Sequence, residues 1–324
     1  MPRAAFSPEG HDNNLGEAIM ESKLAHLKTI LAEVYDLQSA ASLLGWDQQT
    51  NMPPEGAQDR GYQLGTLRKI AHIKFTSEEV GKLLEELSIS IDQLPADSND
   101  ARLIKVTRRD YQKQIKIPPE YVEEFALITT QAFQVWQEAR TEDNFPKFRP
   151  YLEKVTVLRR QYADFFAPYE HVYDPLLDDY EPGLKTAEVK TIFDALRPQQ
   201  VALIKAITER PQVDFSFLYQ PYDEQKQWNF GVEVITRFGY DWNRGRQDKS
   251  THPFTQSFSR NDVRITTRVN PNYIGAMLFG TMHESGHAIY EQGVDTALAR
   301  SPLASGASLA FHESQSRLWE NRSL

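Results

Sequence analysis

The chain has 324 residues, of which 40% are hydrophobic and 25% charged, as in an ordinary soluble globular protein that buries a large core. Acidic residues outnumber basic ones by 45 to 36, and the formal net charge of −9 disfavours nucleic acid or an anionic membrane as the main partner. The absence of cysteine excludes disulfides and thiolate metal sites and suits the cytoplasm. No apolar run is long enough for a signal peptide or a membrane span.

The first half of the chain is predicted to be helical. Residues 1–15 mix Pro, Gly, Asn and Asp and indicate a flexible leader. From Glu17 to about Leu44, apolar residues recur at helical spacing and predict a long amphipathic helix. Thr76-Ser77-Glu78-Glu79 has the form of a capping box, which marks the start of a helix. Further helices are expected at about 57–70, 78–87, 100–115, 119–142 and 147–167.

The segment from Tyr173 to Gly183 is rich in Asp, Pro and Tyr. Its acidic residues lack the spacing of an EF-hand, so we expect a solvated connector and not a calcium site. Helices are predicted to resume after Thr186, an expected N-cap, and again at about 223–238.

The composition changes between Gly239 and Val269. Two runs, 252–259 and 263–269, are rich in β-branched and aromatic residues, and the turn at 260–262 predicts an antiparallel hairpin. In the second strand, alternation places Arg264 and Arg268 on one face. Asn270 is the expected N-cap of a helix that begins at Pro271 and ends at Gly293.

The sequence therefore predicts a mainly α fold with a small antiparallel hairpin beside one particular helix. We divide it into a leader (1–15), a helical N-terminal region (16–238) and a hairpin followed by helices (239–324). The last two are expected to form one continuous catalytic domain.

A metal-binding motif lies inside the helix that follows the hairpin. His283-Glu284-Ser285-Gly286-His287 places two histidines at positions i and i+4, which lie on one helix face one turn apart. Two imidazoles so arranged can bind one zinc ion, and Glu284 can reach a water on that ion as a general base.

A catalytic zinc takes three protein ligands, so a third must come from elsewhere. The helix at 311–320 offers Glu313 and Glu320. We favour Glu313, because Glu320 is expected to pair with Arg317 or Arg322 on the surface. Glu291 is the weakest choice, because it points along the same helix as the histidines.

An exopeptidase must also hold a terminal carboxylate, which suits a forked guanidinium. Arg264 and Arg268 are the candidates, with surface charge on an edge strand as the plain alternative. An exposed strand edge there could also pair with the backbone of a substrate. His252 is expected on the substrate side of the site, and both His252 and His312 are expected to support the metal site and not to ligate the ion.

These motifs together resemble the carboxypeptidase Taq family of metallocarboxypeptidases. The resemblance covers the chain from about residue 46 to its end, beginning with Trp46-Asp47-Gln48 and the segment at 173–183. Its other elements follow in order: His252-Pro253-Phe254, Asp262-x-Arg264-x-Thr266, His283-Glu284-x-x-His287 and His312-Glu313-Ser314.

The resemblance implies a helical protein with a long groove and usually a homodimer. It implies removal of single residues from peptides with a free C-terminus, with His283, His287 and Glu313 as metal ligands and Glu284 as the catalytic glutamate. One divalent ion is expected, zinc first, with cobalt and manganese as alternatives that the same donors accept.

The chain departs from the family pattern at its end. Two later motifs, Ile-x-Arg-Phe and Gly-x-x-Gln-Asp-x-His-Trp, have no counterpart, so we expect a truncated chain. No residue for stabilising the oxyanion can be named. The alternatives to a carboxypeptidase are a thermolysin-like endopeptidase, which the motif permits, and a catalytically silent fragment that associates through exposed apolar surface.

Overall fold

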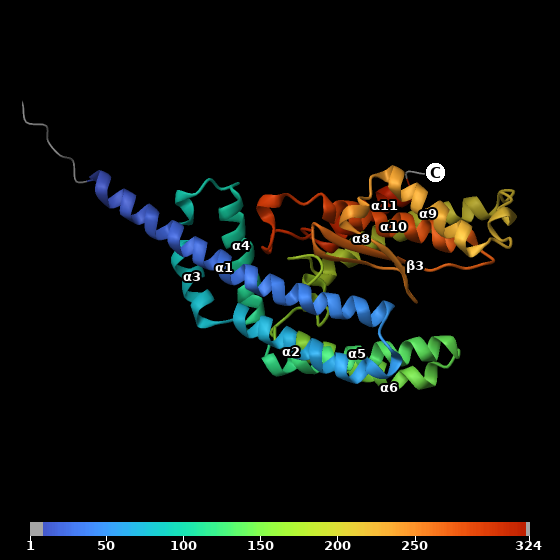
Figure 1. Ribbon diagram of the computed structural model, residues 1–324, viewed down its shortest axis with the longest axis horizontal. Coiled ribbons are helices and arrows are strands. Elements are labelled where there is room, and N and C mark those ends of the chain that lie inside the picture. The colour runs from blue at the N-terminus through green and yellow to red at the C-terminus, as the bar shows by residue number, and fades with distance from the viewer. Residues whose placement is uncertain (1–8, 322–324) are drawn as a thin grey trace, which may run out of the picture.

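The computed structural model describes residues 9–321 of the chain (Figure 1). Helices dominate, and one small sheet lies beside α10, as expected for a mainly α fold. The longest helix, α1, runs between a helical group that contains α2, α5 and α6 and a second group that contains the sheet and α9–α11 (Figure 1). The helices are α1 (Glu9–Thr50), α2 (Ala57–Phe75), α3 (Glu78–Ile89), α4 (Asn99–Gln114), α5 (Pro119–Thr141), α6 (Phe145–Asp164), α7 (Asp174–Asp178), α8 (Thr186–Thr208), α9 (Glu224–Phe238), α10 (Ile274–Gln292) and α11 (Leu309–Asn321).

Helix α1 has 42 residues, which corresponds to a length of about 63 Å. It begins before the predicted start at Glu17 and so includes residues 9–15 of the expected leader, whereas residues 1–8 lie outside the described part. Leu24, Leu27 and Leu31 lie on one face because they are three or four residues apart, and they pack against α3 and α4. Helix α1 therefore contributes one side of the hydrophobic core of the N-terminal region.

The predicted capping box does begin a helix. The Ser77 hydroxyl accepts a hydrogen bond from the Val80 N–H, at 3.4 Å, and α3 starts at the next residue, Glu78. Ser98 caps α4 in the same way through the Ala101 N–H. The predicted helices at 57–70, 100–115, 119–142 and 147–167 correspond to α2, α4, α5 and α6.

The sheet has three strands in the order β1-β3-β2, with β1 (Gln247–Lys249), β2 (Thr255–Ser259) and β3 (Asp262–Thr267). The predicted hairpin is the antiparallel pair β2 and β3, and β1 adds a parallel strand to β3. Strand β3 is therefore central, so the alternative in which Arg264 is a surface charge on an edge strand is wrong. The two outer strands are β1 and β2.

Both faces of the sheet are covered. Val263 and Ile265 are fully buried against α9 and α10, in a cluster with Ile235 and Ala288. The opposite face meets α1, whose Ser39 hydroxyl donates to the Phe258 carbonyl at 3.0 Å. The small sheet thus connects α1 to α10.

Two predicted helix starts and one predicted connector differ from the structure. Asn270 and Pro271 form a turn, in which the Asn270 side chain accepts from the Asn272 N–H, and α10 begins only at Ile274. The segment after Tyr173 is not wholly solvated, because it contains α7 and because Asp174 is only 3% exposed. The Asp174 carboxylate accepts hydrogen bonds from the N–H and hydroxyl of Thr186, so Thr186 is a donor and not the predicted cap.

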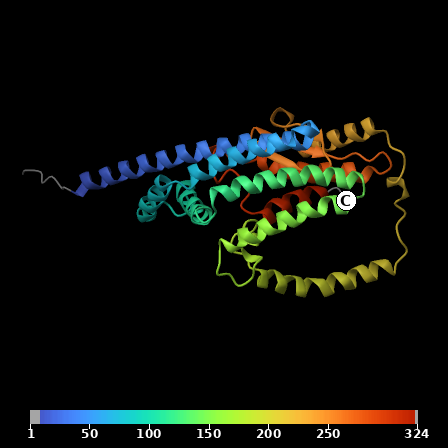
Figure 2. The same ribbon diagram turned by 90° about the horizontal axis from the view of Figure 1, so that it is seen from below.

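Helix α8 lies apart from the other helices (Figure 2). None of its residues is buried, and it exposes a row of large apolar side chains that includes Phe193, Leu196 and Ile204. Among residues 9–321, we find no helix with the length and apolar character that crossing a membrane requires.

Candidate metal centre

The two motif histidines lie on one face of α10, as their spacing predicts. Their ring centroids are 5.0 Å apart and the rings are nearly perpendicular, at 78°. Both side chains are mostly covered, with 19% of His283 and 13% of His287 exposed. The helix ends at Gln292, and Gly293 caps it as predicted.

Helix α11 brings Glu313 to these histidines. Its Oε1 lies 3.5 Å from His283 Nε2, and its Oε2 lies 3.1 Å from His287 Nε2. One ligand atom from each of the three residues falls within 4.8 Å of the others, so a single ion could contact all three. The structure thus brings together the three residues that the sequence suggested as metal ligands.

Gly286 allows α11 to approach α10 this closely. A Cβ atom at Gly286 would lie 2.7 Å from the Ser316 Cα and 2.9 Å from the Gln315 carbonyl oxygen, closer than such contacts occur. Ser316 itself is fully buried at this crossing. The glycine between the two motif histidines therefore sets the separation of the two helices that carry the ligands.

Glu284 lies deep beside the ligands, with only 7% of its surface exposed. Burial raises the pKa of its carboxyl group, and the nearby Glu313 carboxylate adds to this rise, whereas the Thr255 hydroxyl and His283 oppose it. Thr255, on β2, has its hydroxyl 2.7 Å from Glu284 Oε2 and donates to that carboxylate. Sequence reasoning did not identify Thr255, although its place two residues after His252-Pro253 put it in the predicted hairpin.

Each motif histidine has its second ring nitrogen engaged. His283 Nδ1 lies 3.1 Å from Glu320 Oε2, which also accepts from Arg317 at 2.8 Å. The pairing of Glu320 with Arg317 was predicted, but its contact with His283 was not. His287 Nδ1 lies 2.5 Å from Nδ1 of His312.

The nitrogens that face Glu313 are suited to bind a metal. Burial, together with the nearby His312 and His283 rings, lowers the pKa of His287 to about 4. The ring is therefore neutral near pH 7 and can offer a lone pair. With both Nδ1 atoms occupied elsewhere, the two Nε2 atoms and a carboxylate converge, which is the donor set that zinc accepts in catalytic sites.

A hollow of about 560 Å³ opens beside these residues. Its walls come from α1, from the segment 252–257 that includes the β2 edge, and from α10 and α11. Glu284, His287 and His312 line it, and so does His252. His252 is thus on the groove side, where the sequence suggested a substrate contact.

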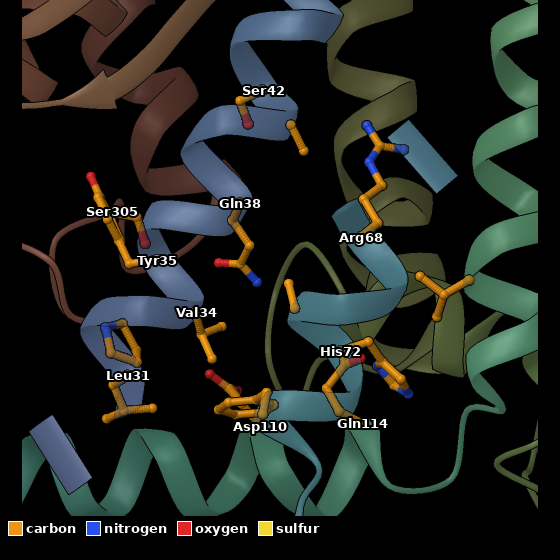
Figure 3. A pocket seen from close by; sticks show the side chains of 15 residues that line it. Leu31, Val34, Tyr35, Gln38, Ser42, Arg68, His72, Asp110, Gln114 and Ser305 are labelled. Carbon is orange, nitrogen blue, oxygen red and sulfur yellow. The ribbon is translucent and has the colours of Figure 1, made fainter. Parts of the chain in front are cut away.

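A second hollow, of about 620 Å³, lies between α1 and α2 (Figure 3). The two share Tyr35, Gln38, Ser42 and Ser305. Arg68 reaches into the second hollow from α2, opposite α1 (Figure 3). Together the hollows form a groove that leads away from the candidate metal ligands.

The two arginines suggested for substrate binding lie elsewhere. Arg264 donates to both carboxylate oxygens of Asp262 at 2.8 Å, and its guanidinium stacks 4.6 Å from the ring centroid of Trp46. This contact is on the α1 face of the sheet, opposite the face that packs on α10. Arg268 lines a different hollow, together with Arg140 and Lys249.

Comparison with known proteins identifies the family. The profile of the carboxypeptidase Taq (M32) metallopeptidases matches residues 26–323. The chain belongs to this family. It is 33% identical over 293 residues to carboxypeptidase 1 of Bacillus subtilis (strain 168), and 36% identical over 313 residues to thermostable carboxypeptidase 1 of Thermus thermophilus. These alignments cover 90% and 93% of this chain.

Solved structures of the family share the fold. The BsuCP crystal structure superposes with a TM-score of 0.89 at 32% identity, and the M32 carboxypeptidase of Deinococcus radiodurans R1 with 0.79 at 38%. Both matches cover 93% of this chain but 60% of the other chain. The chain likewise spans 58% and 61% of the B. subtilis and T. thermophilus relatives.

Proposed function

We propose that this chain carries the catalytic metal centre of a carboxypeptidase that releases single C-terminal residues from peptides. The observation that supports this most directly is the convergence of His283, His287 and Glu313, with the buried Glu284 beside them. Relatives that align over most of this chain are named carboxypeptidases.

The ligand residues would hold one divalent ion. Two imidazole nitrogens and a carboxylate favour zinc, while cobalt and manganese accept the same donors. An ion bound there would supply Lewis acidity toward the scissile carbonyl and toward a water molecule.

Glu284 would act as the general base. Its carboxylate accepts the proton of the attacking water and delivers it to the leaving amine. Burial raises the pKa of this carboxyl group, which makes the carboxylate a stronger base than a solvated one. The Thr255 hydroxyl holds the carboxylate in place through the 2.7 Å hydrogen bond to Oε2.

The substrate would lie in the groove between α1 and β2. Because β2 is an outer strand of the sheet, a peptide backbone could pair with its exposed edge. His252 lines this part of the groove. Arg264 and Arg268 remain the arginines that the sequence suggested for the terminal carboxylate, although both lie away from the metal-side hollow.

A matched pair of peptides tests this proposal. The zinc-loaded chain is incubated with one peptide that has a free C-terminus and with the same peptide amidated, and the released products are identified by mass spectrometry. A carboxypeptidase releases the last residue of the free peptide and leaves the amide intact. Internal cleavage of both peptides would instead establish an endopeptidase.

A further inference from the structure

Glu291 is a buried carboxylate that the proposed reaction does not use. It lies one turn beyond His287 on α10, and 7% of its surface is exposed. In the described part of the chain its ion-pair partner is His312 on α11, whose Nε2 lies 2.7 Å from Glu291 Oε1. Burying a carboxylate costs free energy unless a well-placed partner offsets it, and His312 is that partner.

The contact continues to the candidate ligand His287. His312 Nδ1 lies 2.5 Å from His287 Nδ1, and His287 Nε2 faces Glu313 at 3.1 Å. Glu291, His312 and His287 therefore form an unbroken row of hydrogen-bonding atoms that ends at the ligand cluster.

The chemistry of this row fixes where each hydrogen lies. An ionised carboxylate only accepts hydrogen bonds, so the His312 nitrogen that faces Glu291 must carry a hydrogen. In a neutral ring the other nitrogen, Nδ1, then has a lone pair and accepts from His287 Nδ1–H. His287 is thereby held in the tautomer whose Nε2 lone pair points at Glu313 and is free to bind a metal.

We propose that His312 and Glu291 are positioning residues that hold His287 in its metal-binding tautomer and orientation. This inference rests on the metal centre of the proposed function. Metal-bound histidines commonly donate their second N–H to such a partner, and losing that partner typically lowers metal affinity 10–100-fold. Here the partner is a second histidine, which is adjacent in sequence to the ligand Glu313.

The corresponding arrangement at His283 is more exposed. Glu320 contacts His283 directly, has 20% of its side chain exposed and shares one oxygen with Arg317. Because water and Arg317 already compete for that carboxylate, we expect its loss to weaken metal binding less than the loss of Glu291.

The first test measures metal affinity without any peptide substrate. Zinc and cobalt dissociation constants of the full chain are determined by competition with a chelator for the unchanged protein, Glu291→Leu, Glu291→Gln and His312→Phe. We expect Glu291→Leu and His312→Phe to raise the dissociation constant 10–100-fold. Glu291→Gln should have a smaller effect, since its amide oxygen still accepts from His312.

Asp174→Asn provides the control for general damage. Asp174 is similarly buried and accepts two hydrogen bonds, but it lies in α7 and contacts Thr186, not the ligand cluster. This variant should lose stability and keep its metal affinity. If Glu291→Leu folds and its metal dissociation constant stays within twofold of that of the unchanged protein, the proposal is overturned.

Nitrogen NMR of the unchanged, zinc-loaded chain gives a second test that needs no variant. Long-range ¹H–¹⁵N spectra should show a protonated Nδ1 on His287 and an unprotonated Nδ1 with a protonated Nε2 on His312. The reverse tautomers would overturn the proposal even if every variant failed to fold. Metal binding with these tautomers but without hydrolysis would contradict only the proposed function, whereas a chain that binds no metal would contradict both.

Discussion

Glu284 is held between opposing influences. Burial raises the pKa of its carboxyl group, while the Thr255 hydroxyl stabilises the ionised form. A carboxylate with a raised pKa is a stronger base than a fully solvated one, which supports the role proposed for Glu284. Single substitutions can separate this proposed role of Glu284 from the metal-binding role proposed for Glu313.

We expect Glu284→Gln to lower the rate of hydrolysis by about 10²–10⁴-fold or more, because an amide cannot accept the proton. The metal should stay bound, because His283, His287 and Glu313 are unchanged. Release of C-terminal residues and zinc content are measured on the same sample. Turnover at the original rate would remove Glu284 from the mechanism.

Glu313→Ala should instead remove the metal, because it deletes the only ligand that α11 contributes to the described cluster. Zinc content after dialysis is the measurement. Glu320→Ala is the matched comparison, since Glu320 lies on the same helix and reaches His283 without joining the cluster. If Glu313→Ala kept a full equivalent of zinc, the third ligand would have to be sought elsewhere.

The proximity of the three candidate ligands could be predicted from sequence because the signal is local. His283 and His287 are one turn apart on any helix, and Glu313 is the first acidic residue of the next α-helix, α11. The contacts of Glu291, His312 and Thr255 could not be named, because they exist only where α10 crosses α11 and β2. A helical repeat contains no information about which side chain meets which across such a crossing.

At the scale of elements, the crossing of α10 and α11 depends on Gly286. We expect Gly286→Ala to force the helices apart, to destabilise the fold by about 1–3 kcal/mol and to weaken metal binding although every ligand is retained. Thermal denaturation and a zinc titration measure the two effects.

Gly280→Ala is the control on the same helix, because a Cβ there meets only the Pro253 side chain, at an ordinary 3.7 Å. It should leave metal affinity unchanged and stabilise the helix slightly, since alanine has the higher helix propensity. Equal metal affinities for the two variants would show that the close approach at Gly286 is not needed.

The packing of α5 on α6 predicts a loss of stability at alkaline pH. Burial raises the pKa of Tyr121 to about 12, and its hydroxyl donates to the Leu158 carbonyl at 2.9 Å. The unfolded chain loses this proton near pH 10, whereas the folded chain retains it, so stability should fall between about pH 10 and 12. Two pKa units correspond to roughly 2–3 kcal/mol.

Tyr121→Phe isolates this contribution. At pH 8 the variant should be less stable by about 1 kcal/mol, because it lacks the hydrogen bond. The difference in free energy of unfolding between the unchanged protein and the variant should shrink and then reverse as the pH rises from about 10 to about 12. Denaturant unfolding at several pH values measures it, and a difference that stayed constant up to pH 11.5 would contradict the assignment.

Elements with a strong periodic pattern were predictable, and those defined by tertiary contacts were not. Alternating β-branched residues indicated β2 and β3, but β1 is three residues long and consists of Gln, Asp and Lys, so it has no apolar alternation to detect. Asn270-Pro271 has the composition of a helix start, yet the Asn270 carbonyl also accepts from Gln227 of α9, and the turn persists until Ile274. The division at residue 238 stays a prediction.

At the scale of the whole molecule, α8 is the least covered part of the described chain. Phe193 and Ile204 are 61% and 59% exposed and lie on one helix face, since they are about three turns apart. Apolar surface of this kind is a site of association. The chain also spans only about three fifths of the length of its relatives. Self-association through α8 can therefore be measured independently of catalysis.

We expect the chain to associate with itself as its concentration rises, with α8 as the contact. Analytical ultracentrifugation measures the molar mass of the unchanged chain, of Phe193→Glu with Ile204→Glu, and of Ile89→Glu as the control. Ile89 is 81% exposed but lies at the end of α3, away from the α8 row. A chain that stayed monomeric at all concentrations would contradict this prediction.

The candidate ligands come from two helices, α10 and α11, whose close approach depends on Gly286. An ion bound by His283, His287 and Glu313 would therefore tie α10 to α11, and only the folded chain offers that arrangement. Binding of this kind adds about 2.7 kcal/mol to stability when the free ion is at 100 times its dissociation constant. In a cell, the amount of folded protein would then follow the supply of the metal, and scarcity of the ion would lower the survival of the protein as well as its activity.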